Sequence, residues 1–328
     1  MRPLCKNTRS ALCILLLACI VCATIEAKSN ATEQERTPAK AYIWGMNVPS
    51  YRQVFDEFPE DITNAVAIAG GDRFALYLMP DGTVKGWGSN VLGVLDIPPD
   101  LPKVKMIAAG ADHCVALTES GTIVEWGRLG WKKKLPDIAP GLSNIVAVSA
   151  GLDRTLALKA DGSVISWQSD LFKEDMSPMP DGLTNVTAIA SGGFHHLALR
   201  RDGTVAAWGL GSSQRPVGGY AWRQSIVPAA ATNIVAIAAR GSTSLALNKN
   251  GKVIVWGGVE EYGQRPVPSN CVDVVAITCS PTFCMALKRD GTVVVWGGGQ
   301  EKNMPQDLRD VRLIGAGSVF SIAVTRAR

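Results

Sequence analysis

The segments KMIAAGADHCVALTESGTIVEWG (residues 105–127) and VAITCSPTFCMALKRDGTVVVWG (residues 275–297) decide the fold, because they are two copies of one unit. Each copy has a short β-rich run, a turn of small residues, a run of the form LAL, a tight turn, and a last run ending in Trp-Gly. β-Branched and aliphatic residues of this kind favour strands. The unit therefore predicts short antiparallel strands joined by turns.

The unit recurs along the whole chain, as its tryptophans show. Seven of the nine tryptophans are spaced by 43, 39, 41, 41, 48 and 40 residues, and all but one of the seven precede a glycine. A large aromatic ring at the end of an apolar strand fills the space between stacked sheets, so we expect these side chains in the core. The series consists of Trp44, Trp87, Trp126, Trp167, Trp208, Trp256 and Trp296.

Six tight turns accompany the tryptophans. Asp-Gly, Asn-Gly and Ser-Gly pairs supply the positive φ that two-residue hairpin loops need, so each pair predicts a β-hairpin. The pairs are Asp81-Gly82, Ser120-Gly121, Asp161-Gly162, Asp202-Gly203, Asn250-Gly251 and Asp290-Gly291.

The two ends of the array predict how it closes. Trp44-Gly45 has no hairpin partner before it, and the run at 320–325 has the LAL character but no Trp-Gly after it. Six complete hairpins and two halves make seven units of about 40 residues, a period typical of β-propellers. We therefore predict an all-β, seven-bladed β-propeller over residues 41–328. The strand at 41–45 should pair with the strand at 320–325, because closing the ring removes the last open sheet edge.

The signature DGTVxxWG, followed after a loop by xxVVAIAxGxxHxLALxxDG, resembles the regulator-of-chromosome-condensation repeat, over residues 41–328. Within that family, the 40-residue period and the leader are most similar to secreted bacterial propellers, which include a β-lactamase inhibitor protein. The resemblance implies a protein partner, bound by the turns before the LAL runs. It also implies a structural hydrogen bond for His113 and His195, which occupy a position where the family usually has histidine.

The N-terminus predicts export. Three basic residues precede an apolar run at 11–23, which is shorter than the roughly 20 residues that span a bilayer. We expect residues 1–23 to be an export signal, with a lipoprotein signal cleaved before Cys19 as the alternative. Residues 24–40 are polar and without pattern, so they read as a flexible linker. The predicted location is extracellular or periplasmic. The alternative is a lipid-anchored protein of the cell envelope.

The charge of the mature chain argues against nucleic acid. The formal net charge is +4, but residues 1–23 hold three basic residues and no acidic ones. Removing them leaves a nearly neutral protein, without the basic excess that binds phosphate backbones. We therefore expect a monomeric protein that binds another protein, without nucleic acid, a membrane span or a cofactor.

Strand alternation sorts the loops onto two faces of the ring. The tight Gly turns lie on one face, and the turns before the LAL runs lie on the other together with the loops after Trp-Gly. Arginine and aromatic residues are enriched at interface hot spots, and the candidate contact set on this second face follows that preference. It consists of Arg73, Asp112, Trp131, Asp153, Phe194, His195, Phe283 and Phe320.

Other features leave alternatives open. No nucleophile elbow, phosphate-binding loop or zinc-protease motif occurs, so we expect no catalysis. A β-lactamase inhibitor, and a glycan hydrolase or lyase with acids at the channel mouth, remain the alternatives. The three histidines make a poor metal site, and none is expected. Cys279 and Cys284 could form a disulfide or remain buried thiols. The inserted segment around Tyr220 and Trp222 either binds a partner or packs on the outer edge.

Overall fold

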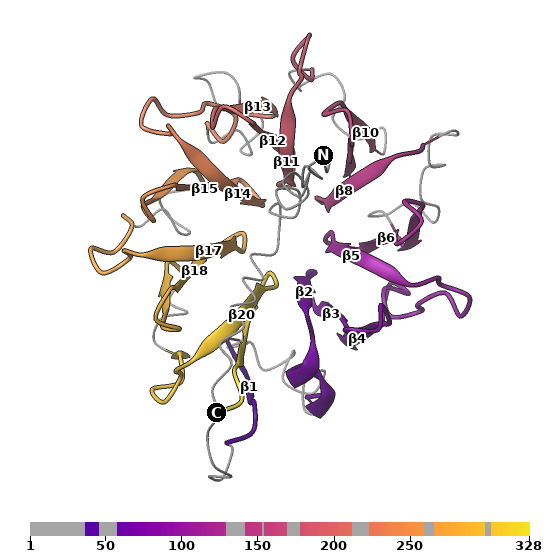
Figure 1. Ribbon diagram of the computed structural model, residues 1–328, viewed down its shortest axis with the longest axis vertical. Coiled ribbons are helices and arrows are strands. Elements are labelled where there is room, and N and C mark those ends of the chain that lie inside the picture. The colour runs from indigo at the N-terminus through magenta and orange to yellow at the C-terminus, as the bar shows by residue number, and fades with distance from the viewer. Residues whose placement is uncertain are drawn as a thin grey trace, which may run out of the picture.

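The computed structural model is a closed ring of seven sheets, each built from three antiparallel strands (Figure 1). It describes residues 37–45, 58–128, 142–152, 154–168, 178–211, 223–258, 266–298 and 303–328. The prediction of seven blades is confirmed. Within the described residues, no helix is long and apolar enough to cross a membrane. A short 3-10 helix, η1 (Glu60–Asn64), precedes the first complete blade.

The blades follow one another in chain order. Blades 1 to 3 are β2 (Ala67–Gly70), β3 (Phe74–Leu78) and β4 (Val84–Gly88); β5 (Val104–Ala109), β6 (His113–Thr118) and β7 (Ile123–Gly127); and β8 (Ile145–Ala150), β9 (Arg154–Lys159) and β10 (Val164–Gln168). Blades 4 to 6 are β11 (Val186–Ser191), β12 (His195–Arg200) and β13 (Val205–Gly209); β14 (Ile234–Arg240), β15 (Thr243–Asn248) and β16 (Val253–Gly257); and β17 (Val274–Cys279), β18 (Cys284–Lys288) and β19 (Val293–Trp296).

Blade 7 closes the ring with both ends of the described chain. It consists of β20 (Val311–Ala316), β21 (Phe320–Thr325) and β1 (Ala41–Gly45). β1 pairs with β21 in antiparallel register, with Ile43 opposite Ile322 and Tyr42 opposite Ala323 (Figure 1). The predicted pairing of 41–45 with 320–325 is therefore confirmed.

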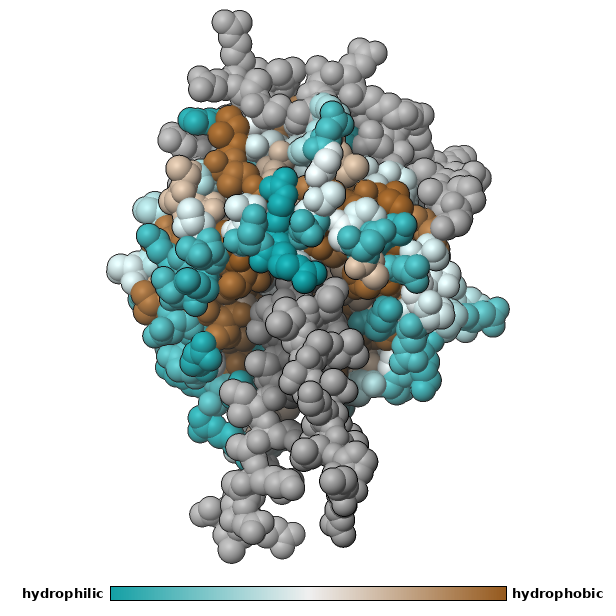
Figure 2. Space-filling model, turned by 45° about the horizontal axis from the view of Figure 1, so that its top comes forward, coloured by the Kyte–Doolittle hydropathy of each residue, from teal (hydrophilic) through white to brown (hydrophobic). Residues whose placement is uncertain are grey.

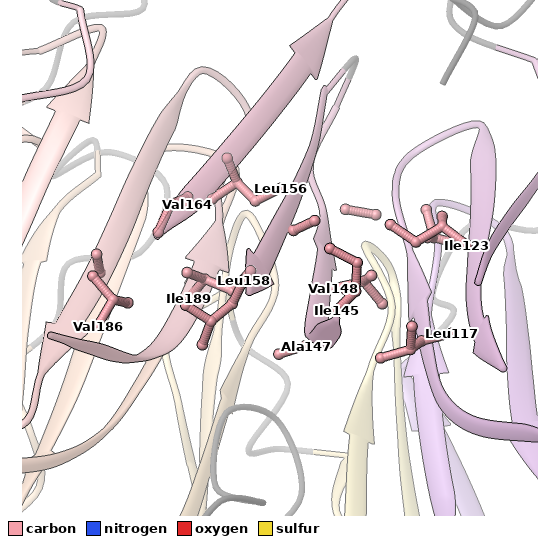
Figure 3. Packing of buried hydrophobic residues seen from close by; sticks show 14 of the residues in the cluster. Leu117, Ile123, Ile145, Ala147, Val148, Leu156, Leu158, Val164, Val186 and Ile189 are labelled. Carbon is pink, nitrogen blue, oxygen red and sulfur yellow. The ribbon is translucent and has the colours of Figure 1, made fainter. Parts of the chain in front are cut away.

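The core lies between the blades. The middle strand of each blade is buried nearly throughout, because sheets cover both of its faces. Aliphatic side chains from neighbouring blades interdigitate, as Figure 3 shows for Leu117 and Ile123 of blade 2, Val148 of blade 3 and Ile189 of blade 4. All seven tryptophans of the repeat are also buried, as predicted.

The tight turns have the predicted conformation. In the first, Gly82 has φ +86°, which side chains other than glycine rarely adopt, and the Asp81 carboxylate accepts a hydrogen bond from the Thr83 amide at 2.9 Å. We call the face that carries these turns the lower face. The opposite face carries the turns between the first and second strands of each blade, and we call it the upper face.

Figure 2 shows apolar stretches between clusters of hydrophilic side chains on one side of the ring.

Candidate functional site

Hydrogen bonds between blades hold the upper-face turns in a collar around the central channel. The amide of Ser318 in blade 7 donates to Gly71 in blade 1, and the amide of Asp72 donates to Ala111 in blade 2. The amide of Ala111 in turn donates to Gly151 in blade 3. The turns of blades 7, 1, 2 and 3 are thus linked in series, so their side chains have defined positions relative to one another.

Arg240 reaches across the channel mouth. Its guanidinium donates to the carbonyl oxygens of Gly70 and Ala109, both at 2.9 Å, and to that of Gly110 at 3.4 Å. The arginine belongs to blade 5 and its three partners to blades 1 and 2, so one side chain joins opposite sides of the ring. The channel below has a cavity of about 130 Å³ lined mainly by small residues of the first strands.

Arg240 was not among the residues predicted from the sequence, although a signal was present. Five of the other blades have glycine at its position in the turn, and blade 6 has Ser280. At Gly71 and Gly192 a Cβ atom would lie 2.1 Å from the ring of Phe74 or His195, which packs against the glycine. Blade 5 has the smaller Thr243 in place of that ring, so a long side chain fits.

Two carboxylates lie close to Arg240 on the collar. Burial raises the pKa of Asp112, the negative charge of Asp72 raises it further, and the positive charges of Arg73 and Arg240 oppose the shift. Oδ2 of Asp72 lies 3.9 Å from Nε of Arg73, and both side chains are about half exposed. The channel mouth near blades 1 and 2 therefore carries charges of both signs.

A pocket of about 180 Å³ opens beside these charges, between blades 1 and 2. Its rim carries charged side chains and its floor is apolar, with Val91 standing 77% exposed at the edge. Its lining consists of Asp72, Arg73, Phe74, Ser89, Val91, Leu92, Val94, Ala111 and Asp112.

The loop that forms one wall of the pocket is anchored to blade 2. The indole nitrogen of Trp126 donates to the carbonyl oxygen of Val94 at 2.8 Å, and the Asn90 side chain accepts from the Leu95 amide at 2.7 Å. The same device recurs in blade 5, where Trp256 donates to Gln224 at 2.9 Å. Trp126 and Trp256 therefore fix loops of the upper face as well as filling the core, so the pocket beside Val94 is largely preformed.

The structure brings some predicted contact residues together. Arg73 and Asp112 line the pocket, and Phe194 is half-buried in the equivalent turn of blade 4. Trp131 and Asp153 lie outside the described residues, as do Tyr220 and Trp222 of the insertion.

Three predicted contact residues are in the wrong place. His195, Phe283 and Phe320 are almost completely buried, so they cannot form the surface that was predicted for them. His195 and Phe320 are the first residues of their second strands, and Phe283 directly precedes the second strand of blade 6. Consecutive residues of an extended chain point to opposite sides of a sheet. A shift of one position therefore moves a side chain from the upper face into the core.

The buried histidines instead connect blades. Nε2 of His113 lies 3.1 Å from the Thr155 hydroxyl in blade 3, and Nε2 of His195 lies 2.7 Å from the Ser244 hydroxyl in blade 5. Burial lowers the pKa of each of these histidines to about 3, so both are neutral at physiological pH. The structural hydrogen bond expected for these two residues is confirmed.

The cysteines are buried thiols. Cys279 and Cys284 face each other across neighbouring strands without forming a disulfide, and Cys114 and Cys271 are likewise not disulfide-bonded. No group of three or more histidine, cysteine or acidic residues that could hold a metal occurs within the described residues.

Comparison with protein families identifies the repeat. The model of the regulator of chromosome condensation (RCC1) repeat matches residues 65–93 and 186–214. The ultraviolet-B receptor UVR8 of Arabidopsis thaliana is 36% identical over 73 residues. That match spans 18% of this chain and 17% of the receptor.

Solved structures share the fold. Prp20p of Saccharomyces cerevisiae, described with its binding to Gsp1p and histones, superposes with a TM-score of 0.71 at 21% identity, covering 89% of this chain and 92% of that one. The ectodomain of the Arabidopsis thaliana receptor kinase ACR4 gives a TM-score of 0.56 at 19% identity, covering 74% and 83%. At these identities the similarity concerns the fold.

Proposed function

Because the chain is a β-propeller of RCC1-like repeats, we propose that it is an exported, non-catalytic protein that binds another protein through its upper face. Export is supported by the basic and apolar leader at 1–23, and the fold also serves as a receptor ectodomain in ACR4. Prp20p, with the same fold, binds the proteins Gsp1p and histones.

The anchored pocket between blades 1 and 2 carries the proposal. Its apolar floor suits an inserted aliphatic or aromatic side chain, and its rim offers both a guanidinium and two carboxylates for polar contacts. Because collar and loop are already fixed by hydrogen bonds, binding there costs little conformational entropy. Arg73, Asp112 and Val91 form the centre of the contact, and Phe194 extends it toward blade 4.

A pull-down with matched variants tests this proposal. The chain from residue 24 is used as bait against its own envelope fraction and medium, together with Arg73→Ala/Asp112→Ala and with Val91→Asp. We expect both variants to lose the partner recovered by the unaltered chain, without a lower Tm. The control Lys103→Ser/Lys105→Ser changes exposed residues of blade 2 away from the pocket. Equal recovery by all four proteins would overturn the assignment of this surface.

A further inference from the structure

The lower face has a charge pattern that the proposed function does not use. Residues 186–328, which form blades 4 to 6 and most of blade 7, contain 15 lysines and arginines against 8 acidic residues, whereas residues 58–168, which form blades 1 to 3, contain 10 against 12. The excess of basic residues therefore lies in blades 4 to 7, and blades 1 to 3 are slightly acidic. An uneven charge distribution affects binding to charged partners, because the electrostatic potentials of neighbouring charged groups add.

The repeat places four basic residues at one level of the ring. Each donates its backbone amide, at 2.9 to 3.0 Å, to the carbonyl of the residue that precedes the first strand of its blade. All four side chains are exposed, and none forms an ion pair within 4.0 Å of a described residue. In blades 1 to 3, Pro80, Glu119 and Ala160 stand at the matching place in the sequence. We call the four residues the basic arc: Arg201, Lys249, Arg289 and Arg326.

Nearby acids reduce this charge without cancelling it. Asp202 and Asp290 accept hydrogen bonds within their own turns, from Thr204 and Thr292. Asp310 pairs with Arg328, and Asp273 lies beside the arc. Four further basic residues on this face, Arg200, Lys252, Lys288 and Arg328, give an excess of basic over acidic side chains.

Exposed aliphatic side chains lie within the arc. A groove of about 440 Å³ between blades 5 and 6 has Lys249 on one side and Arg289 on the other. Val235 lines it and is 42% exposed, and Val272 next to Asp273 is 51% exposed. Two of the five exposed large hydrophobic residues in the described part of the chain therefore stand among these cations.

We propose that the lower face of blades 4 to 7 docks on an anionic lipid bilayer. The phosphate groups of the lipids pair with the basic arc, while Val235 and Val272 enter the interfacial region. Equivalent positions in successive blades of a ring lie in one plane, which matches a flat surface. Each lysine or arginine near such a surface contributes about 1 kcal/mol, and exposed aliphatic residues add to interfacial binding. A nucleic acid backbone would leave the two valines without a role.

Sedimentation with lipid vesicles tests the proposal. The chain from residue 24 contains every described element and lacks the apolar leader, which would itself bind lipid. It is mixed with vesicles of phosphatidylcholine containing 30% phosphatidylglycerol, or of phosphatidylcholine alone. We expect binding to the anionic vesicles only, and loss of binding when salt is raised from 0.05 to 0.5 M, because exposed charges are screened.

Matched triple variants locate the surface. Arg201→Ser/Lys249→Ser/Arg289→Ser should weaken the partition coefficient roughly 100-fold, at about fivefold for each charge. Lys103→Ser/Lys105→Ser/Arg128→Ser removes the same charge from exposed positions in blade 2 and should have a much smaller effect. Val235→Ser/Val272→Ser should weaken vesicle binding but leave the salt dependence of binding unchanged, because no charge is removed. All variants should keep the Tm of the unaltered chain.

Three results would overturn the proposal: no sedimentation with anionic vesicles, equal loss in the two triple variants, or binding to heparin without binding to vesicles. None of them bears on the upper-face pocket, because the basic arc and the two valines lie on the lower face and Lys103, Lys105 and Arg128 do not line the pocket. The Arg73→Ala/Asp112→Ala variant should bind vesicles normally even where it loses the protein partner, so the two proposals can fail separately.

Discussion

Nε2 of His195 in blade 4 lies 2.7 Å from the hydroxyl oxygen of Ser244 in blade 5, in a site without solvent exposure. The Ser244 hydroxyl also donates to the carbonyl of Gln224 at 3.1 Å, so the imidazole is the donor to serine. A neutral imidazole supplies this bond, and a second proton on Nδ1 would place a positive charge in the buried core. The folded ring is therefore more stable when His195 is uncharged.

Stability should fall in mild acid for this reason. The pKa of His113 and of His195 is lowered by burial to about 3, against 6.5 in the unfolded chain, so the unfolded state binds more protons between these values. Below pH 6.5, each histidine therefore lowers the free energy of unfolding by about 1.4 kcal/mol for every pH unit. Above pH 6.5 the histidine is neutral in both states and lowers it no further. Urea unfolding between pH 4 and pH 7 measures the slope.

His195→Phe is the matched control, because blades 1, 6 and 7 carry phenylalanine at this position. Its slope below pH 6.5 should be smaller by about 1.4 kcal/mol per pH unit, while all carboxylates contribute as before. Identical slopes for the two proteins would show that His195 titrates normally in the folded state.

Arg240 should contribute to stability through three backbone carbonyls. Arg240→Met keeps much of the side-chain volume and leaves the carbonyls of Gly70, Ala109 and Gly110 without their donor. A buried acceptor that loses its donor costs about 1–3 kcal/mol. We expect urea unfolding at pH 7 to give a loss of about 3 kcal/mol, since channel water replaces part of the bonding.

Arg240→Lys provides the comparison. It keeps the charge but cannot form the planar fork that spans two blades. A loss of about 1 kcal/mol is expected. A methionine variant as stable as the unaltered chain would mean that water fully satisfies these carbonyls.

The ring could be predicted from sequence because its signal is periodic. Seven tryptophans at near-constant spacing fix the number of blades, and the unpaired Trp44-Gly45 fixes how the ends meet. The upper face was harder to predict. Arg73 and Asp112 were found because they lie in the turn itself, whereas His195 and Phe320 lie one residue later. Moving one residue along a strand reverses the direction of the side chain. Repeat alignment alone does not say which of two consecutive positions carries the side chain that faces solvent.

Arg240 was missed for a different reason. Its role depends on carbonyls contributed by blades more than 120 residues away in sequence. No local pattern encodes that contact. The useful signal was the exception to the repeat, a long basic residue in a turn where the other copies have glycine or serine.

The four cysteines of the described residues should be unreactive while the chain is folded. All four are buried, and burial raises the thiol pKa of Cys271 to about 11 and those of Cys114 and Cys284 well above the ordinary value. The thiolate is the reactive form, so a thiol reagent at pH 8 should label the chain from residue 24 only slowly. In guanidinium chloride it should label four thiols. Labelling of only two would show that Cys279 and Cys284 form a disulfide.

Ring closure by β1 should dominate the stability of blade 7. β1 supplies the buried Trp44 and five pairs with β21, and Thr325 donates its amide to Lys40 at 2.9 Å. Without β1, Trp44 leaves the core and the edge of β21 opens to solvent. Removing one buried tryptophan side chain costs about 3–5 kcal/mol. A chain starting at residue 46 should therefore lose at least about 4 kcal/mol of unfolding free energy relative to one starting at residue 37.

Two comparisons make this measurement specific. The chain from residue 37 should match the chain from residue 24, because every described contact of β1 is retained. Trp44→Ala in the longer chain should lose about 3–5 kcal/mol, less than deletion of the whole strand, because the backbone pairing with β21 survives. Equal stability of the chains from 37 and from 46 would mean that blade 7 holds without its third strand, and that the two ends of the chain do not lock the ring.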